Sequence, residues 1–369
     1  MKKNRTFIRL FIFSLILASH AAFTSCLSKK AVKEYSRVDA VLGTVCIVRI
    51  LTEKPEAEAA SILETVFTEL KRLEQIFNAN GDSNNTENAH ISELEKVNRL
   101  AGIKPAQISD ELYTLVETAL FFAEKTDGAF NPAIGPLVKL WNIGFDTQEV
   151  NGKKKSRCPT QEEIDSVLPL LNYRNIILQK NTIFLQKKGM RLDLGGIAKG
   201  YAADRAAQML KNADITNALI DLGGNIYALG KNKKNENWKI GIKNPNIGKT
   251  NSVMTAALTN KSLVTSGNYE RYFEENGILY HHILDWKTGY PVNTNLNAVS
   301  IICEKSVYAD ALSTAAFVLG NAKTKRLLQS MPELKAAAFF FFTGNKIVSL
   351  TDNLENSISF EIVDTDFTH

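Results

Sequence analysis

The 369-residue sequence contains few cysteines. Cys26, Cys46, Cys158 and Cys303 are far apart, and no two of them form a Cys-x-x-Cys pair. This spacing offers neither the paired thiolates of a structural zinc site nor the dense framework of a small disulfide-stabilised domain. The last three thiols are therefore expected to be buried or incidental, whereas Cys26 has a different setting.

The chain also lacks a large excess of either charge. Most of its net charge of +5 comes from Lys2, Lys3, Arg5 and Arg9, and without these four, 40 basic and 39 acidic residues remain. The lysine run at 153–155 lies between Gly152 and Ser156 and is typical of a solvated loop. We therefore expect no nucleic-acid partner.

The apolar run near the N-terminus is too short to span a bilayer comfortably. It covers residues 10–17, follows basic residues and precedes small ones, which is typical of a secretory signal. The segment ends in "AAFTSC", so small residues directly precede Cys26, as in lipoprotein signals. We predict a lipoprotein-type signal peptide at 1–25, lipidation of Cys26 and a tether at 26–35. The alternative is simple cleavage nearby, which leaves Cys26 free.

This signal also predicts where the protein resides. An exported chain with a lipid on Cys26 would be anchored to the outer face of the inner membrane, on the periplasmic side. The membrane is thus an expected partner through the lipid alone.

The remainder of the chain alternates predicted strands and helices. Its β-branched residues predict a strand at 41–50. Apolar residues at helical spacing predict helices over 56–77 and 110–125, with Ser109 as the N-cap of the second. The apolar residues at 336–344 predict a buried strand.

The stretch "RLDLGGIAKGYAAD" places a lysine in the first turn of a predicted helix. Residues 190–194 predict a strand and 197–210 a helix, with a glycine turn between them. The spacing matches neither a Walker A loop nor a GxGxxG fingerprint. A positive charge is unfavourable at a helix N-terminus, where backbone N–H groups favour an anion. Lys199 therefore indicates a bound anion, and the alternative is a side chain that simply reaches water.

The stretch "YADALSTAAFVLG" suggests a metal site. Asp310 and Thr314 are four residues apart and share one face of the predicted helix. A carboxylate and a hydroxyl side by side are hard oxygen ligands, which suit Mg²⁺ better than zinc. The alternative is a helix in which Thr314 bonds back to the main chain.

The third stretch covers residues 265–291. Ser266 and Gly267 could form a turn beside a ligand. His281 and His282 would point to opposite sides of a strand, so only one of them can face a site. A histidine near a phosphate is a natural general base. The alternative is one surface histidine and one that is hydrogen-bonded within the fold.

Seven short motifs occur in a fixed order. They are LGT (42–44), DGAFNPAIGPLVKLW (127–141), DLGGIAKGYAAD (193–204), DLGGNIYALG (221–230), TSGNYERYF (265–273), HILDWKTGYP (282–291) and ADALSTAAFVLG (309–320). Over roughly residues 36–350, the chain resembles the ApbE family of FAD:protein FMN transferases. It departs from the family pattern at Trp286, where proline is usual, and at Leu42, where methionine is common.

The resemblance implies a fold and a reaction. It implies one α+β domain over 36–369, related to the T-fold, with mixed sheets and flanking helices. The reaction would be Mg²⁺-dependent transfer of FMN from FAD to a Thr or Ser hydroxyl of an acceptor protein, with release of AMP. The acceptor would be of the redox-pump or FMN-binding-domain type. Hydrolysis of FAD to FMN and AMP, and FAD binding without turnover, are the alternatives.

The resemblance also assigns residues by position. The metal ligands would be the main-chain oxygen of Gly196 and the side chains of Asp310 and Thr314. The general base would be His282 or, as second choice, Asp193. A histidine base would give the pH–rate profile a limb at roughly pH 6 to 7. The FAD-binding residues would be Leu42, Ala129, Phe130, Asn131, Asp193, Lys199, Ser266, His282 and Leu284.

Overall fold

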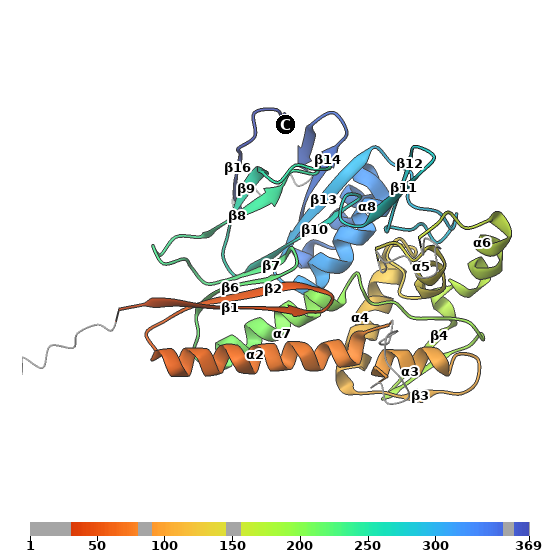
Figure 1. The fold of residues 1–369 in the computed structure, drawn as a ribbon, viewed down its shortest axis with the longest axis horizontal. Coiled ribbons are helices and arrows are strands. Elements are labelled where there is room, and N and C mark those ends of the chain that lie inside the picture. Colours follow the sequence, from red (N-terminus) through yellow and green to blue (C-terminus); the bar gives the residue numbers. More distant parts are fainter. Residues whose placement is uncertain (1–30, 80–90, 145–155, 350–357, 369) are drawn as a thin grey trace, which may run out of the picture. The chain divides into compact units, whose positions relative to one another are not determined.

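The structure is a computed structural model that describes residues 31–79, 91–144, 156–349 and 358–368. Glu34–His369 form one compact unit. Helices and antiparallel strand pairs occur together in it (Figure 1), which confirms the predicted α+β class. The predicted signal peptide and residues 26–30 of the tether, Cys26 among them, lie outside the described residues, whereas residues 33–35 of the predicted tether belong to a strand. They stay predictions, as does the domain boundary at residue 36.

The main sheet contains eight strands within the described ranges, and each strand pair whose register is resolved is antiparallel. Alternate residues of a strand face opposite sides of a sheet. The central strands therefore present apolar side chains on both faces of the sheet. The spatial order is β1 (Lys33–Val41), β2 (Thr44–Thr52), β6 (Asn217–Leu222), β7 (Asn225–Leu229), β10 (Lys261–Gly267), β13 (Leu296–Cys303), β14 (Ala337–Phe342) and β15 (Lys346–Ser349).

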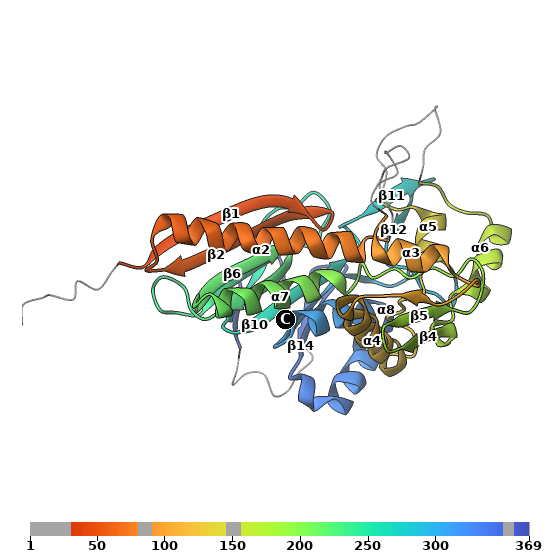
Figure 2. The ribbon, with the colours of Figure 1, turned by 90° about the horizontal axis from the view of Figure 1, so that it is seen from below.

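Three helices cover one face of this sheet, as Figure 1 and Figure 2 show together. They are α2 (Glu56–Phe77), α7 (Ala198–Asn212) and α8 (Ser306–Ser330). Their apolar side chains join strand residues such as Ile220 and Val264 in the largest buried cluster. None of the described helices has the length and apolar character needed to cross a membrane.

A second sheet packs on the opposite face. It has the order β16 (Ser359–Ile362), β9 (Ser252–Leu258) and β8 (Trp238–Lys243). Apolar residues of these strands share a buried cluster with Leu263 and Ile302 of the main sheet.

Smaller elements surround one end of the main sheet. They place two loops, at 126–134 and 282–292, beside one cavity with the first turn of α7 and the N-terminal half of α8. The helices are α3 (Glu93–Arg99), α4 (Asp110–Lys125), α5 (Gly135–Trp141) and α6 (Gln161–Val167), with 3-10 turns at Leu168–Leu170, Tyr173–Asn175 and Pro332–Leu334. The strands are β3 (Ala106–Gln107), β4 (Ile176–Gln179), β5 (Thr182–Leu185), β11 (Tyr272–Glu275) and β12 (Ile278–His281).

Four local predictions are confirmed. The helix predicted at 56–77 is α2, and the one predicted at 110–125 is α4. The hydroxyl of Ser109 accepts a hydrogen bond from the N–H of Leu112 at 3.3 Å, so it is the N-cap. The predicted buried strand contains β14.

The strand predicted at 41–50 is instead parts of two strands. The chain turns at Leu42 and Gly43, whose φ angles are 57° and 68°, and returns as β2. A two-residue hairpin turn of this kind needs positive φ at both positions. Leucine rarely adopts such a φ, so no turn was expected at Leu42.

The prediction of a strand at 190–194 is wrong, because these residues form no strand. Met190, Leu192 and Leu194 are buried in alternation, as in a strand. The main chain of Leu192, however, pairs with a side chain: its N–H donates to Asn98 Oδ1 at 2.7 Å, and its carbonyl accepts from Asn98 Nδ2 at 3.1 Å. An asparagine amide therefore takes the place of a neighbouring strand.

Candidate active site

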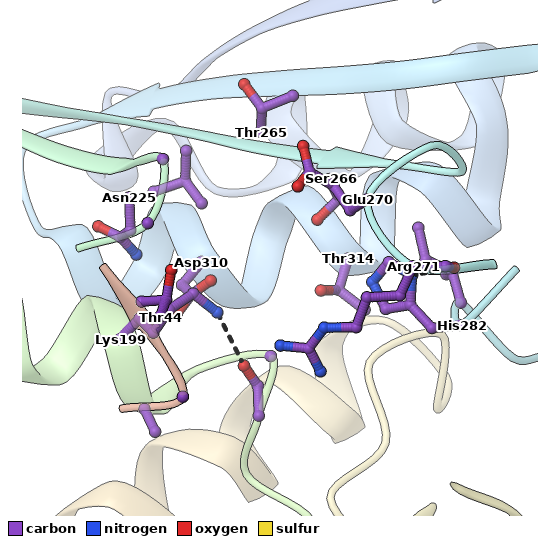
Figure 3. A pocket seen from close by; sticks show the side chains of 18 of the residues that line it. Thr44, Lys199, Asn225, Thr265, Ser266, Glu270, Arg271, His282, Asp310 and Thr314 are labelled. Carbon is purple, nitrogen blue, oxygen red and sulfur yellow. Dashed lines mark hydrogen bonds between the residues drawn. The ribbon is translucent and has the colours of Figure 1, made fainter. Parts of the chain in front are cut away.

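A cavity of about 810 Å³ lies beside the first turn of α7 and the N-terminal half of α8. Its lining includes a helical wall and a hairpin wall. The helical wall consists of Lys199, Asp310 and Thr314, and the hairpin wall consists of Arg271, His282 and Leu284, on or next to β11 and β12 (Figure 3). Every residue that the sequence assigned to FAD or to the metal lines this cavity: Leu42, Ala129, Phe130, Asn131, Asp193, Gly196, Lys199, Ser266, His282, Leu284, Asp310 and Thr314.

Lys199 is the second residue of α7, as the sequence predicted. The first turn of this helix contains no acidic residue, and its N-cap, Ile197, offers no side-chain hydrogen bond. Lys199 Nζ donates to the carbonyl of Gly195 at 3.2 Å, which holds the ammonium group against the cavity (Figure 3). The positive end of the helix dipole and the lysine together make this wall suited to an anion.

Asp310 is almost completely buried, with 4% of its surface exposed. Its Oδ2 accepts a hydrogen bond from the N–H of Gly200 at 2.8 Å. Burial raises the pKa of this carboxyl, and the charge of Lys199 opposes the rise. A buried carboxylate favours a cation beside it, because a charge removed from water needs compensation.

The groups predicted to hold a metal meet in this region. A Cβ added at Gly196 would lie 3.1 Å from Thr314 Oγ1, so the glycine main chain runs close to that hydroxyl. Among the described residues no group of three or more His, Cys, Asp or Glu side chains could hold a metal ion. One carboxylate with a hydroxyl and a carbonyl suits Mg²⁺, which commonly uses one or two carboxylates together with phosphate oxygens.

His282 contacts the main chain of Arg271 twice. Its N–H donates to the carbonyl of Arg271 at 3.1 Å, and its ring Nδ1 lies 3.2 Å from the same oxygen. A carbonyl can only accept, so Nδ1 carries the proton and Nε2 keeps its lone pair. This tautomer could accept a proton at Nε2.

The surroundings of His282 change the predicted pH dependence. Burial, assisted by the charge of Arg271, lowers the pKa of His282 to about 3. The ring is therefore neutral at physiological pH, and a limb at pH 6 to 7 is no longer expected from it. His281 points away from the cavity, where its Nε2 lies 3.1 Å from the carbonyl of Val292. The prediction that one of the two histidines faces the site is confirmed.

Two other predicted residues are engaged in shaping loops. Asp193 Oδ1 accepts from the N–H of Gly195 at 2.8 Å and closes the turn before α7. The Asn131 amide donates to the carbonyl of Leu171 at 2.8 Å and accepts from the N–H of Ala133 at 2.9 Å. Both residues line the cavity, but these side-chain atoms already have protein partners.

Several polar residues of the cavity were not predicted from the sequence, among them Arg271 and Asn225. Arg271 lies in the quoted "TSGNYERYF" motif, and Asn225 lies in the second "DLGG" stretch. Asn225 is 1% exposed and its Oδ1 accepts from the Ser306 hydroxyl at 2.6 Å, whereas its Nδ2 has no partner within the described part of the chain. Both motifs had been noted, but nothing in them distinguishes a cavity residue from a surface residue.

The fold is that of a solved family of proteins. The crystal structure of the ApbE protein from Thermotoga maritima superposes with a TM-score of 0.74 at 34% identity, over 86% of this chain and 97% of that one. The family model for the ApbE family matches residues 42–339. The chain belongs to the ApbE family, which confirms the resemblance.

Two relatives carry a functional name. The FAD:protein FMN transferase of Treponema pallidum is 39% identical over 355 residues, which cover 92% of this chain and 93% of the relative. The FAD:protein FMN transferase of Klebsiella pneumoniae is 35% identical over 327 residues, which cover 88% of this chain and 93% of that protein. The similarity thus extends over nearly the whole chain.

Proposed function

We propose that this protein transfers FMN from FAD to a Thr or Ser hydroxyl of an acceptor protein, with release of AMP and with Mg²⁺ as cofactor. The observation that carries the proposal is the single cavity in which Lys199, Asp310, Thr314 and His282 all meet. The names of the relatives support it, because the similarity to these relatives extends over nearly the full length of this chain.

The reaction exchanges one phosphorus–oxygen bond for another. The acceptor hydroxyl oxygen attacks the FMN-side phosphorus, the bond from that phosphorus to the bridging oxygen breaks, and AMP leaves with the bonding electrons. The hydroxyl proton passes to a base, for which the free Nε2 of His282 is the first candidate and Asp193 the second. The product is a phosphoester between FMN and the acceptor.

The chain's own groups serve the charge of the diphosphate. Lys199 would bind its oxygens, as phosphoryl transfer depends mainly on electrostatic stabilisation and positioning. Gly196, Asp310 and Thr314 would hold Mg²⁺, which when bound neutralises negative charge on phosphate oxygens. The buried Asp310 carboxylate is the feature that fits a cation best.

The apolar part of the cavity suits a flat ring system. Val138 of α5 lines it together with Leu284, next to the fully buried Trp141. Trp141 is fixed in place, since its Nε1 donates to the carbonyl of Gly289 at 2.8 Å. The flavin or adenine ring of FAD would lie against this surface, with the diphosphate toward the helical wall.

One assay separates this function from its alternatives. The protein is incubated with FAD, Mg²⁺ and a candidate acceptor domain, FMN on the acceptor is followed by in-gel fluorescence, and AMP by chromatography. Transfer requires both products in equal amounts, with loss of both when EDTA is added. AMP with free FMN would instead identify a hydrolase, and FAD binding without AMP would identify a binding protein.

We also propose that the protein is exported and held at the outer face of the inner membrane by a lipid on Cys26. The support is the signal-like sequence that ends in "AAFTSC". A single acyl chain binds a membrane weakly and several chains bind it firmly. Cys26→Ala should therefore be released into the soluble fraction after cleavage, and a variant that stays with the membrane contradicts the anchor.

A further inference from the structure

Arg271 is one of the cations that line the cavity besides Lys199, together with Lys243. It directly precedes β11, whose Tyr272 is paired with His281 of β12. The same antiparallel register places Arg271 opposite His282. Side chains of directly opposed residues lie on the same face of a strand pair, and Figure 3 shows both reaching the cavity.

The side chain of Arg271 runs over a glycine. A Cβ added at Gly144 would lie 2.7 Å from Arg271 Cδ and 2.8 Å from its Cβ, well inside contact distance. The missing side chain at Gly144 leaves room for the arginine to lie along the cavity wall. In Figure 3 its guanidinium group points from the hairpin wall toward the side that carries Lys199.

The main chain and the side chain of Arg271 have separate tasks. The carbonyl holds both the N–H and the ring of His282. That contact does not require an arginine, because any residue supplies a carbonyl. The guanidinium group extends from this contact into the cavity.

We propose that the Arg271 guanidinium binds a phosphate oxygen of the FAD diphosphate, from the side opposite Lys199. A diphosphate bears charge on both phosphates, so cations on two sides of the cavity would hold it better than one. Guanidinium binds phosphate with two parallel N–H groups and fixes its orientation as well as its charge. Its place next to His282 puts it at the end where the acceptor hydroxyl would lose its proton. This inference rests on the proposed function.

The first test measures binding without turnover. FAD affinity of the full chain is determined by fluorescence titration, ADP is used as a competitor, and riboflavin is the phosphate-free probe. Arg271→Ala should weaken FAD and ADP about 10- to 100-fold, as expected for a lost charged hydrogen bond, and change riboflavin less than about twofold. Arg271→Lys should recover part of the FAD affinity, since it keeps the charge but not the planar fork.

A pair of glycine variants provides a matched test. Gly144 and Gly248 have similar positive φ angles, 78° and 82°, but a Cβ at Gly248 would meet nothing within 4 Å. Both alanine variants therefore carry the same backbone strain, and only Gly144→Ala also displaces Arg271. FAD affinity should fall in Gly144→Ala and remain near the parent value in Gly248→Ala.

Two outcomes overturn the proposal. Arg271→Ala with unchanged FAD affinity would show that the guanidinium does not contact the diphosphate. Equal losses of FAD and riboflavin would show that it merely shapes the cavity. Failure of the proposed function is distinguishable from both, because the unsubstituted chain would then bind no FAD or produce no AMP.

Discussion

The helical wall and the hairpin wall of the cavity are built differently. In the helical wall, α7 and α8 are joined by hydrogen bonds: Asp310 accepts from the N–H of Gly200, and the Asp204 carboxylate accepts from the N–H groups of Ser306 and Val307 at 2.8 and 3.0 Å. In the hairpin wall, β11 and β12 form a two-stranded sheet within the described residues. Such a ribbon is marginally stable alone and depends on its packing.

Because of this difference, we expect the two walls to have different roles. The helical wall holds its carboxylate, hydroxyl and ammonium groups in a frame that exists before any ligand binds. The hairpin wall presents Arg271 and His282 from a ribbon supported by side-chain packing, such as Trp141 against Tyr280 with ring centroids 5.4 Å apart. We therefore expect changes in the helical wall to affect metal binding and folding, and changes in the hairpin wall to affect rate and substrate with little loss of stability.

The largest effect is expected at Asp310. Asp310→Ala should lower Mg²⁺-dependent turnover by about 10⁴-fold, because a bound cation supplies several kcal/mol of charge stabilisation. Added Mg²⁺ should raise the melting temperature of the parent protein through binding to the folded state, and not that of the variant. Asp366→Ala, an exposed aspartate, is the control. Full activity of Asp310→Ala would remove this residue from the metal site.

The next effect is expected at His282. As a base it should contribute about 10²–10⁴-fold to the rate, so His282→Ala should lose turnover by that order while FAD affinity changes little. The pKa of about 3 keeps the ring neutral above that pH. The parent pH–rate profile should therefore show no limb between pH 6 and 7 from this residue. Equal losses of affinity and rate would make His282 a binding residue and leave Asp193 as the candidate base.

A smaller effect on turnover is expected at Lys199. Lys199→Ala should weaken FAD binding about 10- to 100-fold along with turnover, because the ammonium acts through charge. Lys199→Arg should restore part of both. A variant that lost rate without losing FAD affinity would contradict a ground-state contact with the diphosphate.

A stability measurement at Gly200 tests whether the helical wall is held together by close contact between α7 and α8. A Cβ added there would lie 2.4 Å from the carbonyl oxygen of Ser306 and 2.6 Å from Val307 Cα. Gly→Ala within a helix ordinarily stabilises it, but this contact should lower the free energy of unfolding by about 1–3 kcal/mol, as overpacking does. Urea unfolding beside Lys211→Ala, an exposed position of α7, tests the sign. A stabilised Gly200→Ala would mean that α7 and α8 are not tightly joined.

The smallest effect concerns pH and Asp204. Burial raises the pKa of this carboxyl from 3.8 to about 6, against the opposing hydrogen bonds from Val307 and Ser306. The folded state holds the proton more tightly than the unfolded one, so this contribution to stability is present below pH 4 and is lost as the pH rises through 6. Thermal melts between pH 4 and 7 should show this slope in the parent protein, and Asp204→Asn should flatten it.

Much of the cavity could be predicted because its residues belong to short motifs. The lysine in the first turn of α7 and the four-residue spacing of Asp310 and Thr314 carry information about local geometry that survives folding. Arg271 could not be found in the same way, since its place opposite His282 follows from the register of β11 with β12. The pKa of His282 was also out of reach, because it depends on burial by residues distant in the sequence.

In the fold too, some elements could be predicted from local sequence and others could not. The helical period predicted α2 and α4 well, since a helix is decided largely by residues within a few turns. The alternation at 190–194 is a true sign of extended chain, but a strand also needs a neighbour. The turn at Leu42 and Gly43 was missed because leucine disfavours the backbone conformation that it adopts there.

The pairing of Asn98 with Leu192 has a consequence for exchange of amide hydrogens. The loop that leads to Asp193 and Gly196 has no sheet to protect it, yet the Leu192 N–H is buried and hydrogen-bonded to a side chain 94 residues away in the sequence. Deuterium should therefore enter at Leu192 as slowly as in the central strands. The side-chain amide of Asn98, on α3, would then determine how often the loop that leads to Asp193 and Gly196 opens.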